Sequence, residues 1–144
     1  MGTMTDLQLM ILHHEGKRAK PYWDNAEPPR CTIGIGRNIT DKGLSEDEII
    51  HLFNNDVADA IDDVRHCFSC YDQLSRPRQM VLVDMAFNMG RTSLSKFVRF
   101  IGAVHRGDWP DAADEMQASK WYKQVGSRGK TLERMMRDNT SEWV

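Results

Sequence analysis

The stretch LHHEGKRAKPYWDNAEPPRCTIGIGRNIT (Leu12–Thr40) carries two carboxylates, Glu15 and Asp24, where the sequence changes from a helical to an extended pattern. Gly16 is a natural residue to follow a helix C-terminus, so the pattern places Glu15 at a helix end. Asp24 follows an aromatic pair and opens a turn-rich loop. Whether the two acids are a catalytic pair or two surface charges is the question that the stretch raises.

The second part of this stretch predicts a small β region of about residues 16–45. Its segments are short and rich in aromatic or β-branched residues, and Pro28 and Pro29 exclude ladder hydrogen bonds from the loop between them. Gly34 and Gly36 interrupt the second segment. They indicate either a close approach of another group to the backbone or a tight packing corner.

The residues before the stretch predict a short amphipathic helix. Thr5 and Gln8 have the spacing of a capping box. Leu9, Met10 and Leu12 are expected to form its buried side.

The residues after the stretch predict helices only. Ser45 and Glu48 can cap a long helix of about residues 46–65, whose apolar residues recur every three or four positions. A central buried helix follows and runs to Gly90, with Asp84 and Asn88 as polar exceptions that need partners or a cleft.

Further helices are expected from the segment that closes at Gly107, from Asp108 and Pro110, and from about Ser127 to Arg137, with a break across SKWYKQVGSRGK. The fold class is therefore α+β: one domain over residues 1–144, with a β lobe, a linking helix and a helical lobe of about residues 1–15 plus 66–144. A cleft between the lobes is the usual place for a ligand.

Composition limits the possible functions. The net charge is −2, which argues against a polycation that binds nucleic acid. Residues 1–70 are acidic and residues 71–144 basic, so the second half could meet an anionic polymer or could be a solvated face. The three cysteines, an odd number, indicate thiols in a reducing compartment. His66, Cys67 and Cys70 lack a second ligand pair, so no metal is expected.

Two carboxylates can hydrolyse a glycosidic bond if one is protonated and the other ionised. Glu15 faces the negative end of its helix dipole, which disfavours ionisation. Asp24 lies in a polar loop and should stay ionised, and the hydroxyl of Thr32 could hold a water beside it. The spacing alone is a weak signal, since most such pairs are surface charges.

The ordered set EG, YWD, TIGIGRNIT, DMAFNMG and SKWYKQVGSR resembles the lysozymes (endolysins) of T-even-type phages, from about Leu9 to Arg137. The resemblance implies a lysozyme-like fold and hydrolysis of the β-1,4 bond between N-acetylmuramic acid and N-acetylglucosamine in peptidoglycan, without a metal or a cofactor. It implies that Glu15 is the general acid and that Asp24 and Thr32 hold the attacking water in an inverting mechanism. The other matching residues are Phe87 and Asn88 on the cleft floor, Trp121 as a buried aromatic beside them, and Arg128 as the ion-pair partner of the catalytic Glu.

The chain departs from the family pattern in three places. The loop between Asp24 and Thr32 contains the extra segment 26–30. Arg37 stands where the family often has His, so a His-based ion pair is lost there. The segment between Thr40 and Ser45 is short, which predicts a small β lobe and a more open cleft.

Two other functions remain open. A lytic transglycosylase cleaves the same bond with one Glu and leaves 1,6-anhydro products, whereas Asp24 and Thr32 favour hydrolysis. A binding module without activity would not need Glu15. The last helix is basic and amphipathic, so it could act on membranes, but Met135 and Met136 also suit a packed core. Trp23 could stack on a sugar or be buried in the β lobe.

The resemblance also implies the partners and the location. Peptidoglycan glycan strands are the expected partner, the protein is expected to be a monomer, and no stable membrane insertion is expected. The only early apolar run, of four residues from Leu9 to Leu12, is too short for a secretory signal. The enzyme would therefore stay in the host cytoplasm until a separate holin-type pore releases it to the wall.

Overall fold

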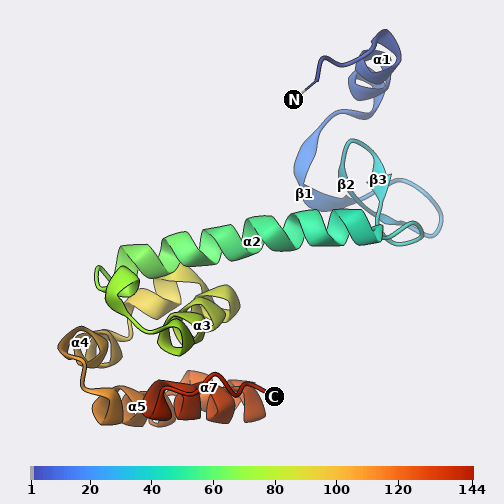
Figure 1. Ribbon diagram of the computed structural model, residues 1–144. Helices are drawn as coiled ribbons and strands as arrows, with labels where there is room; N and C mark the ends of the chain where they lie inside the picture. Colours follow the sequence, from blue (N-terminus) through green and yellow to red (C-terminus); the bar gives the residue numbers. More distant parts are fainter. Residues whose placement is uncertain (1) are drawn as a thin grey trace. The chain divides into compact units, whose positions relative to one another are not determined.

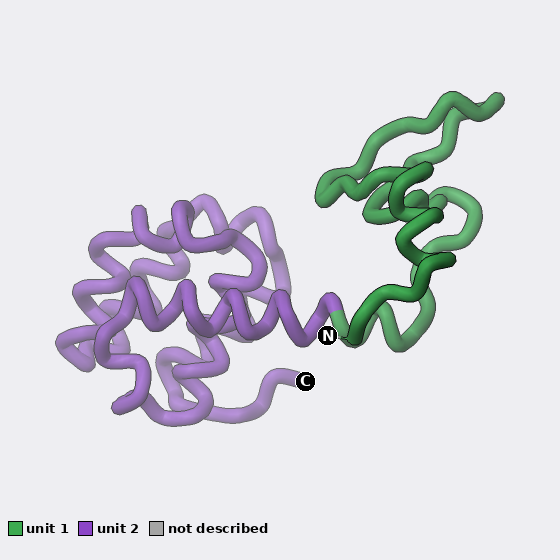
Figure 2. Tube along the Cα trace, turned by 90° about the horizontal axis from the view of Figure 1, so that it is seen from above, with its two compact units in different colours: residues 1–51 green, residues 52–144 purple. Residues whose placement is uncertain are grey.

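The computed structural model describes residues 2–144 and divides the chain into two compact units, Met1–His51 and Leu52–Val144 (Figure 2). Within the described residues there are seven α-helices, one short 3-10 helix and one three-stranded antiparallel sheet (Figure 1). The predicted α+β fold class is confirmed. The predicted grouping of residues 1–15 with the helical lobe stays a prediction, since it concerns contacts between the units.

The first unit contains a small antiparallel sheet of order β1-β2-β3. Its elements are α1 (Asp6–Glu15), β1 (Arg18–Trp23), β2 (Cys31–Gly34), β3 (Arg37–Asn38) and the first turns of α2 (Glu46–Cys67). Arg18 pairs with Gly34 and Tyr22 with Thr32, and the register shifts between these two pairs. Pro21 lies inside the shifted segment, where the absence of its N–H is tolerated because β1 is an edge strand.

The ends of α1 are formed as predicted. The Thr5 N–H donates to Gln8 Oε1 at 2.8 Å, and the Gln8 N–H donates to the Thr5 hydroxyl oxygen at 3.2 Å, which completes the capping box. Gly16 has a φ of 75°, and its N–H donates to the Leu12 carbonyl at 2.8 Å. A left-handed φ is accessible to glycine without a steric penalty, so Gly16 ends the helix at Glu15.

The predicted buried side of α1 has no cover within the first unit. None of its residues is buried, and Leu9 and Met10 are 49% and 50% exposed. Among residues 2–51 only Thr32 is buried. A sheet of three short strands has too little apolar surface to cover a helix, so the apolar pattern of α1 finds no core within this unit.

An ion pair joins β3 to the beginning of α2. Arg37 donates to Glu48 Oε1 at 2.9 Å, so the position where a His-based pair is lost carries an arginine-based pair instead. The Ser45 N–H also donates to Glu48 Oε1 at 2.9 Å, and the Glu48 N–H donates to the Ser45 hydroxyl oxygen, which confirms the predicted capping box. The guanidinium of Arg37, with the Ser45 donors, lowers the pKa of Glu48 from 4.5 to about 2.

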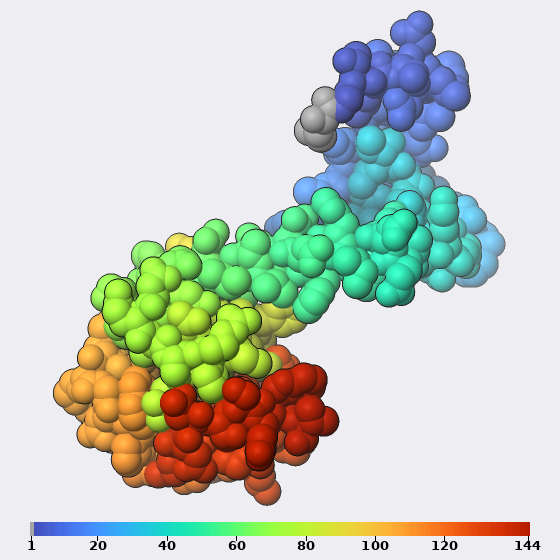
Figure 3. Space-filling view, in the orientation of Figure 1, coloured from blue at the N-terminus to red at the C-terminus, as the bar shows by residue number. Residues whose placement is uncertain are grey.

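The second unit is helical and has the hydrophobic core. Its elements are the rest of α2, the 3-10 helix η1 (Tyr71–Gln73), α3 (Arg76–Ser95), α4 (Val98–Arg106), α5 (Trp109–Gln117), α6 (Lys120–Val125) and α7 (Ser127–Asp138). α5 and α7 lie side by side (Figure 3). The largest fully buried side chains are Phe68, Phe100, Leu82, Met85, Leu94, Met116, Met135 and Met136. Burial of each contributes roughly 1.5–3 kcal/mol before conformational entropy is subtracted.

The predicted helices of this unit are confirmed, and one further helix, α6, lies where a break was expected. The helical path of α3 breaks at Gly90, whose φ is 79°, and Asp108 caps α5 through the Asp111 N–H as expected. The predicted break after residue 118 is only partly right, because Ser119 caps the short helix α6 through the Tyr122 N–H. No helix among the described residues is long and apolar enough to cross a bilayer.

The last helix packs into the core. α7 spans Ser127–Asp138, close to its predicted bounds, and Leu132, Met135 and Met136 on it are buried. The apolar face of α7 is therefore used inside the protein. The core-packed interpretation is confirmed over the membrane-active one.

The pKa of Glu48 predicts how stability depends on pH. A carboxyl whose pKa is lower in the folded state stabilises the fold above its unfolded pKa of 4.5. That contribution is lost as the pH falls from about 5 to about 2. We expect Glu48→Gln to be less stable than the wild type at neutral pH and to lose less stability over this acid range.

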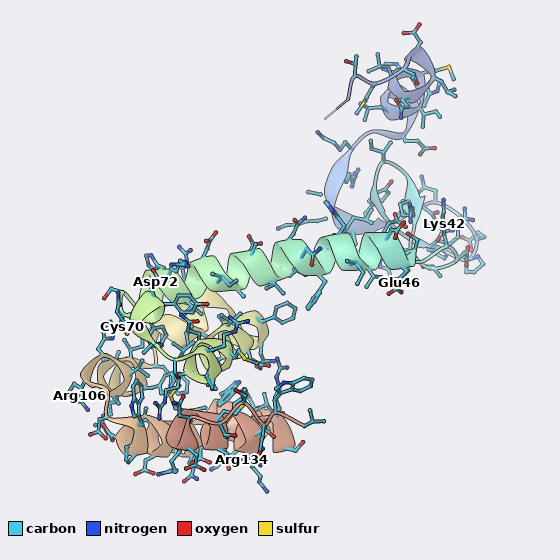
Figure 4. All side chains as sticks on the ribbon, viewed as in Figure 1. Lys42, Glu46, Cys70, Asp72, Arg106 and Arg134 are labelled. Carbon is cyan, nitrogen blue, oxygen red and sulfur yellow. The ribbon has the colours of Figure 1, made fainter. Side chains whose placement is uncertain are left out.

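Urea unfolding followed by far-UV circular dichroism at several pH values measures this effect. Glu46→Gln is the matched control, because Glu46 lies exposed in the same first turn of α2 (Figure 4). A Glu48→Gln variant with the acid dependence of the wild type would contradict the assignment.

Candidate active site

The carboxyl group of Glu15 lies directly over Gly36. A Cβ atom built on Gly36 would be 2.9 Å from both Cδ and Oε2 of Glu15, and the φ of Gly36 is 66°. For Gly36, this close approach decides between the two alternatives that the sequence left open. Gly34 has a similar φ of 69°, but a Cβ there would meet nothing within 4 Å. Of these two glycines, only Gly36 leaves space for the Glu15 carboxyl group.

Asp24 is held by three N–H groups of its own loop. Its Oδ1 accepts from the Ala26 N–H at 3.0 Å and from the Arg30 N–H at 2.9 Å, and its Oδ2 accepts from Arg30 Nε at 3.2 Å. The Arg30 N–H, with the Ala26 N–H and the Arg30 guanidinium, lowers the pKa of Asp24 against the opposing effect of partial burial. The direction of this shift agrees with the prediction that Asp24 stays ionised.

Thr32 is bonded to the same loop residue. Its hydroxyl donates to the Arg30 carbonyl oxygen at 3.2 Å, and the Asp24 N–H donates to the same oxygen at 3.0 Å. Thr32 lies in the middle strand of the sheet and is 5% exposed. The longer loop thus does not separate the two residues, because both contact Arg30. The hydroxyl hydrogen is used in this bond, so Thr32 can offer only lone pairs to a ligand.

Sequence reasoning missed Arg30. It was part of the segment regarded as an insertion that separates Asp24 from Thr32. The sequence does contain a sign of this contact: Arg30 follows Asp24 by six residues, with two prolines between them. A turn over this segment brings the two opposite charges close together.

In the second unit, Asp84 and Asn88 of α3, the two polar residues expected to need partners, are both hydrogen-bonded. Trp121 Nε1 donates to Asn88 Oδ1 at 3.1 Å, and Trp121 is 6% exposed. Arg128 Nε donates to Asp84 Oδ1 at 2.7 Å. The expected pairing of Arg128 with Glu15 would join the two units and stays a prediction.

Phe87 lines an apolar pocket of about 360 Å³ within the second unit. Its ring meets Phe53 of α2 edge to face, with centroids 5.9 Å apart, and the Arg128–Asp84 pair lies at the same pocket. Phe87 is 43% exposed, so its ring is available to a ligand. In the first unit, Trp23 is 70% exposed, which contradicts its burial in the β lobe, and its stacking on a sugar stays a prediction.

Within residues 2–144, the thiols and acids form no metal centre. Cys31, Cys67 and Cys70 are unpaired, and burial raises the pKa of both Cys67 and Cys70 (Figure 4 labels Cys70). Between residues 2 and 144, no three or more His, Cys, Asp or Glu side chains gather closely enough to hold an ion.

Comparison with known proteins shows the family of this chain. The phage lysozyme family model matches residues 12–141. The chain is 30% identical to the pre-baseplate central spike protein Gp5 of Enterobacteria phage T4, over 83% of this chain and 25% of that protein. It is 29% and 24% identical to probable T4-type lysozymes 2 and 1 of Dictyostelium discoideum, over 87% of this chain and 89% of each. The chain thus spans a quarter of the spike protein and most of either lysozyme, and since the family model matches nearly all of it, the chain belongs to the phage lysozyme family.

Proposed function

We propose that this protein is a glycoside hydrolase that cleaves the β-1,4 bond between N-acetylmuramic acid and N-acetylglucosamine in peptidoglycan. Membership of the phage lysozyme family supports this class of reaction. The observation that carries the proposal is the contrast between two acids of one small unit. Three N–H groups hold Asp24 in its ionised form, whereas the Glu15 carboxyl lies over a glycine at the negative end of a helix.

In the proposed reaction, Glu15 donates its proton to the leaving glycosidic oxygen as the bond from that oxygen to the anomeric carbon breaks. A water attacks the anomeric carbon from the opposite face and gives one proton to Asp24. Thr32 accepts the other hydrogen of this water in a hydrogen bond, because its own hydrogen is directed to the Arg30 carbonyl. The product has the inverted anomeric configuration, and exchange with solvent restores both carboxyl groups.

The remaining roles are proposals that rest on the resemblance. Phe87, Asn88 and Trp121 would bind the glycan strand, and Arg128 would support Glu15. A hydrogen bond from Trp121 fixes the side chain of Asn88, and Phe87 is about half exposed. Both features suit a preformed binding surface. We further propose that the protein serves host lysis and reaches the wall from the cytoplasm through a separate membrane pore.

Replacement of the acid tests the function directly. We expect Glu15→Gln to lower the rate of lysis of permeabilised Gram-negative cells by a factor of about 10² to 10⁴, the usual contribution of general acid catalysis. The fall in turbidity gives the rate of lysis. Mass spectrometry identifies the end group of the released glycan, and NMR identifies the anomer that forms first. Lysis by the variant at the wild-type rate would refute the assignment. 1,6-Anhydro ends would indicate a lytic transglycosylase instead.

The contact between Glu15 and Gly36 predicts that Gly36→Ala loses most of its activity, because the new methyl group must displace the carboxyl. Gly34→Ala is the control, since it has the same positive φ and the same backbone strain but no such neighbour. Both variants should lose a similar amount of stability in urea unfolding, about 1 kcal/mol or somewhat more. Equal activities of the two variants would show that backbone strain, and not the contact with Glu15, causes the loss of activity.

Exposed Trp23 is followed directly by Asp24, which predicts that it stacks on a sugar ring. We expect Trp23→Ala to raise KM about threefold to tenfold with little change in kcat, because an aromatic face adds uniform binding. Val98→Ala is the control, because Val98 of α4 is an apolar side chain with a similar exposed fraction, 71%. An unchanged KM for Trp23→Ala on soluble glycan fragments would remove this role.

A further inference from the structure

Arg30 makes four hydrogen bonds to the two residues that would hold the attacking water. Its N–H and its Nε donate to the two carboxylate oxygens of Asp24, at 2.9 and 3.2 Å. Its carbonyl oxygen accepts from the Asp24 N–H at 3.0 Å and from the Thr32 hydroxyl at 3.2 Å. One residue therefore fixes both the backbone and the side chain of Asp24 and the hydroxyl of Thr32.

We propose that Arg30 is a positioning residue, which sets the carboxylate of Asp24 and the hydroxyl of Thr32 so that together they hold the attacking water. This inference rests on the proposed function. It concerns a residue in the part of the loop that departs from the family pattern.

The hydrogen bonds also decide which oxygen takes the proton. A carboxylate has about four lone-pair positions, two on each oxygen. In the described structure, Oδ1 already accepts two N–H groups and Oδ2 accepts one, so Oδ2 keeps room for a further donor. The guanidinium prevents the carboxylate from rotating and exchanging its oxygens. Oδ2 is therefore the oxygen that accepts hydrogen from the water.

The hydroxyl of Thr32 is directed in the same way. Because its hydrogen is donated to the Arg30 carbonyl, the hydroxyl has only lone pairs left and can act only as an acceptor toward a ligand. A water between Asp24 and Thr32 then donates both of its hydrogens to the protein, which leaves a lone pair of its oxygen for the anomeric carbon.

Among the described residues, Asp24 and Asp41 are the two carboxylates that form ion pairs with Arg30. Arg30 is the cation next to Asp24, and its Nη1 lies 3.8 Å from Asp41 Oδ2. Asp41 is 62% exposed at its side chain and also accepts from Asn38, so it competes only weakly for the guanidinium. Loss of the guanidinium should therefore make the ionised form of Asp24 less favourable.

The test compares Arg30→Met and Arg30→Lys with the wild type in steady-state kinetics against pH on soluble glycan fragments. For Arg30→Met we expect kcat to fall about threefold to tenfold, the effect of one half-exposed charged hydrogen bond, with KM nearly unchanged. The acid limb of the kcat profile should move to higher pH, since a base that has lost a cationic donor is protonated more easily. Arg30→Lys should recover part of both effects because it keeps the charge but not the fixed Nε donor.

Arg106→Met is the matched control. Arg106 makes an ion pair with Asp111 at 2.8 Å on the exposed surface of the second unit (Figure 4), so its loss should change neither kcat nor the acid limb. NMR titration of the Asp24 carboxyl carbon provides a second readout that does not require activity. It should show a higher pKa for Asp24 in Arg30→Met and an intermediate value in Arg30→Lys.

The possible results separate the inference from the function it rests on. If Asp24→Asn is inactive but both Arg30 variants keep the wild-type kcat, acid limb and Asp24 titration, the inference is overturned alone. An inactive wild type, or an active Asp24→Asn, overturns the proposed function and the inference with it. If Arg30→Met does not fold by circular dichroism, Arg30→Lys decides: unchanged kinetics contradict the proposal, and a lowered kcat with a shifted acid limb supports it.

Discussion

The first unit is held by directed polar contacts rather than by an apolar core, and the properties of the candidate site follow from this constraint. Of residues 2–51, only Thr32 is buried, and it is polar. The unit is ordered by capping boxes, by the Arg37–Glu48 pair and by the hydrogen bonds of the Asp24 loop. Hydrogen bonds are directional whereas apolar contacts are not, so such a unit can fix the orientation of carboxyl groups while burying little surface.

The same constraint explains why the two acids differ. Asp24 lies where a loop directs several N–H groups at one point, which stabilises negative charge. Glu15 lies at the C-terminus of α1, where the helix dipole has its negative end. Gly36 leaves space for its carboxyl group. The two carboxyl groups thus have different surroundings: N–H groups and the Arg30 guanidinium around Asp24, and a helix C-terminus with a glycine beside Glu15.

The second unit is built differently. Large Phe, Leu, Met and Val side chains of its core are fully buried, and Asp84 and Asn88 of α3 are paired. Asp84 with Arg128 and Asn88 with Trp121 show that a polar residue on an otherwise apolar helix indicates a partner from elsewhere in the chain. The apolar pocket beside Phe87 is formed by residues of α2 and α3 together with Arg128 of α7.

The sequence by itself determined the fold class, both capping boxes, the ends of α1 and α7 and the break at Gly90, because each depends on residues within a few positions of one another. It also indicated that Asp84 and Asn88 needed partners, since a buried polar residue is costly without one, and it left open why Gly34 and Gly36 interrupt a strand. Only the tertiary structure decided which neighbours these residues have: Glu15 over Gly36, Arg128 with Asp84, Trp121 with Asn88. The exposure of Trp23 within the first unit and the contacts of Arg30 were likewise decided there. Burial and pairing depend on which distant segments meet in space, and no local pattern of residues records that.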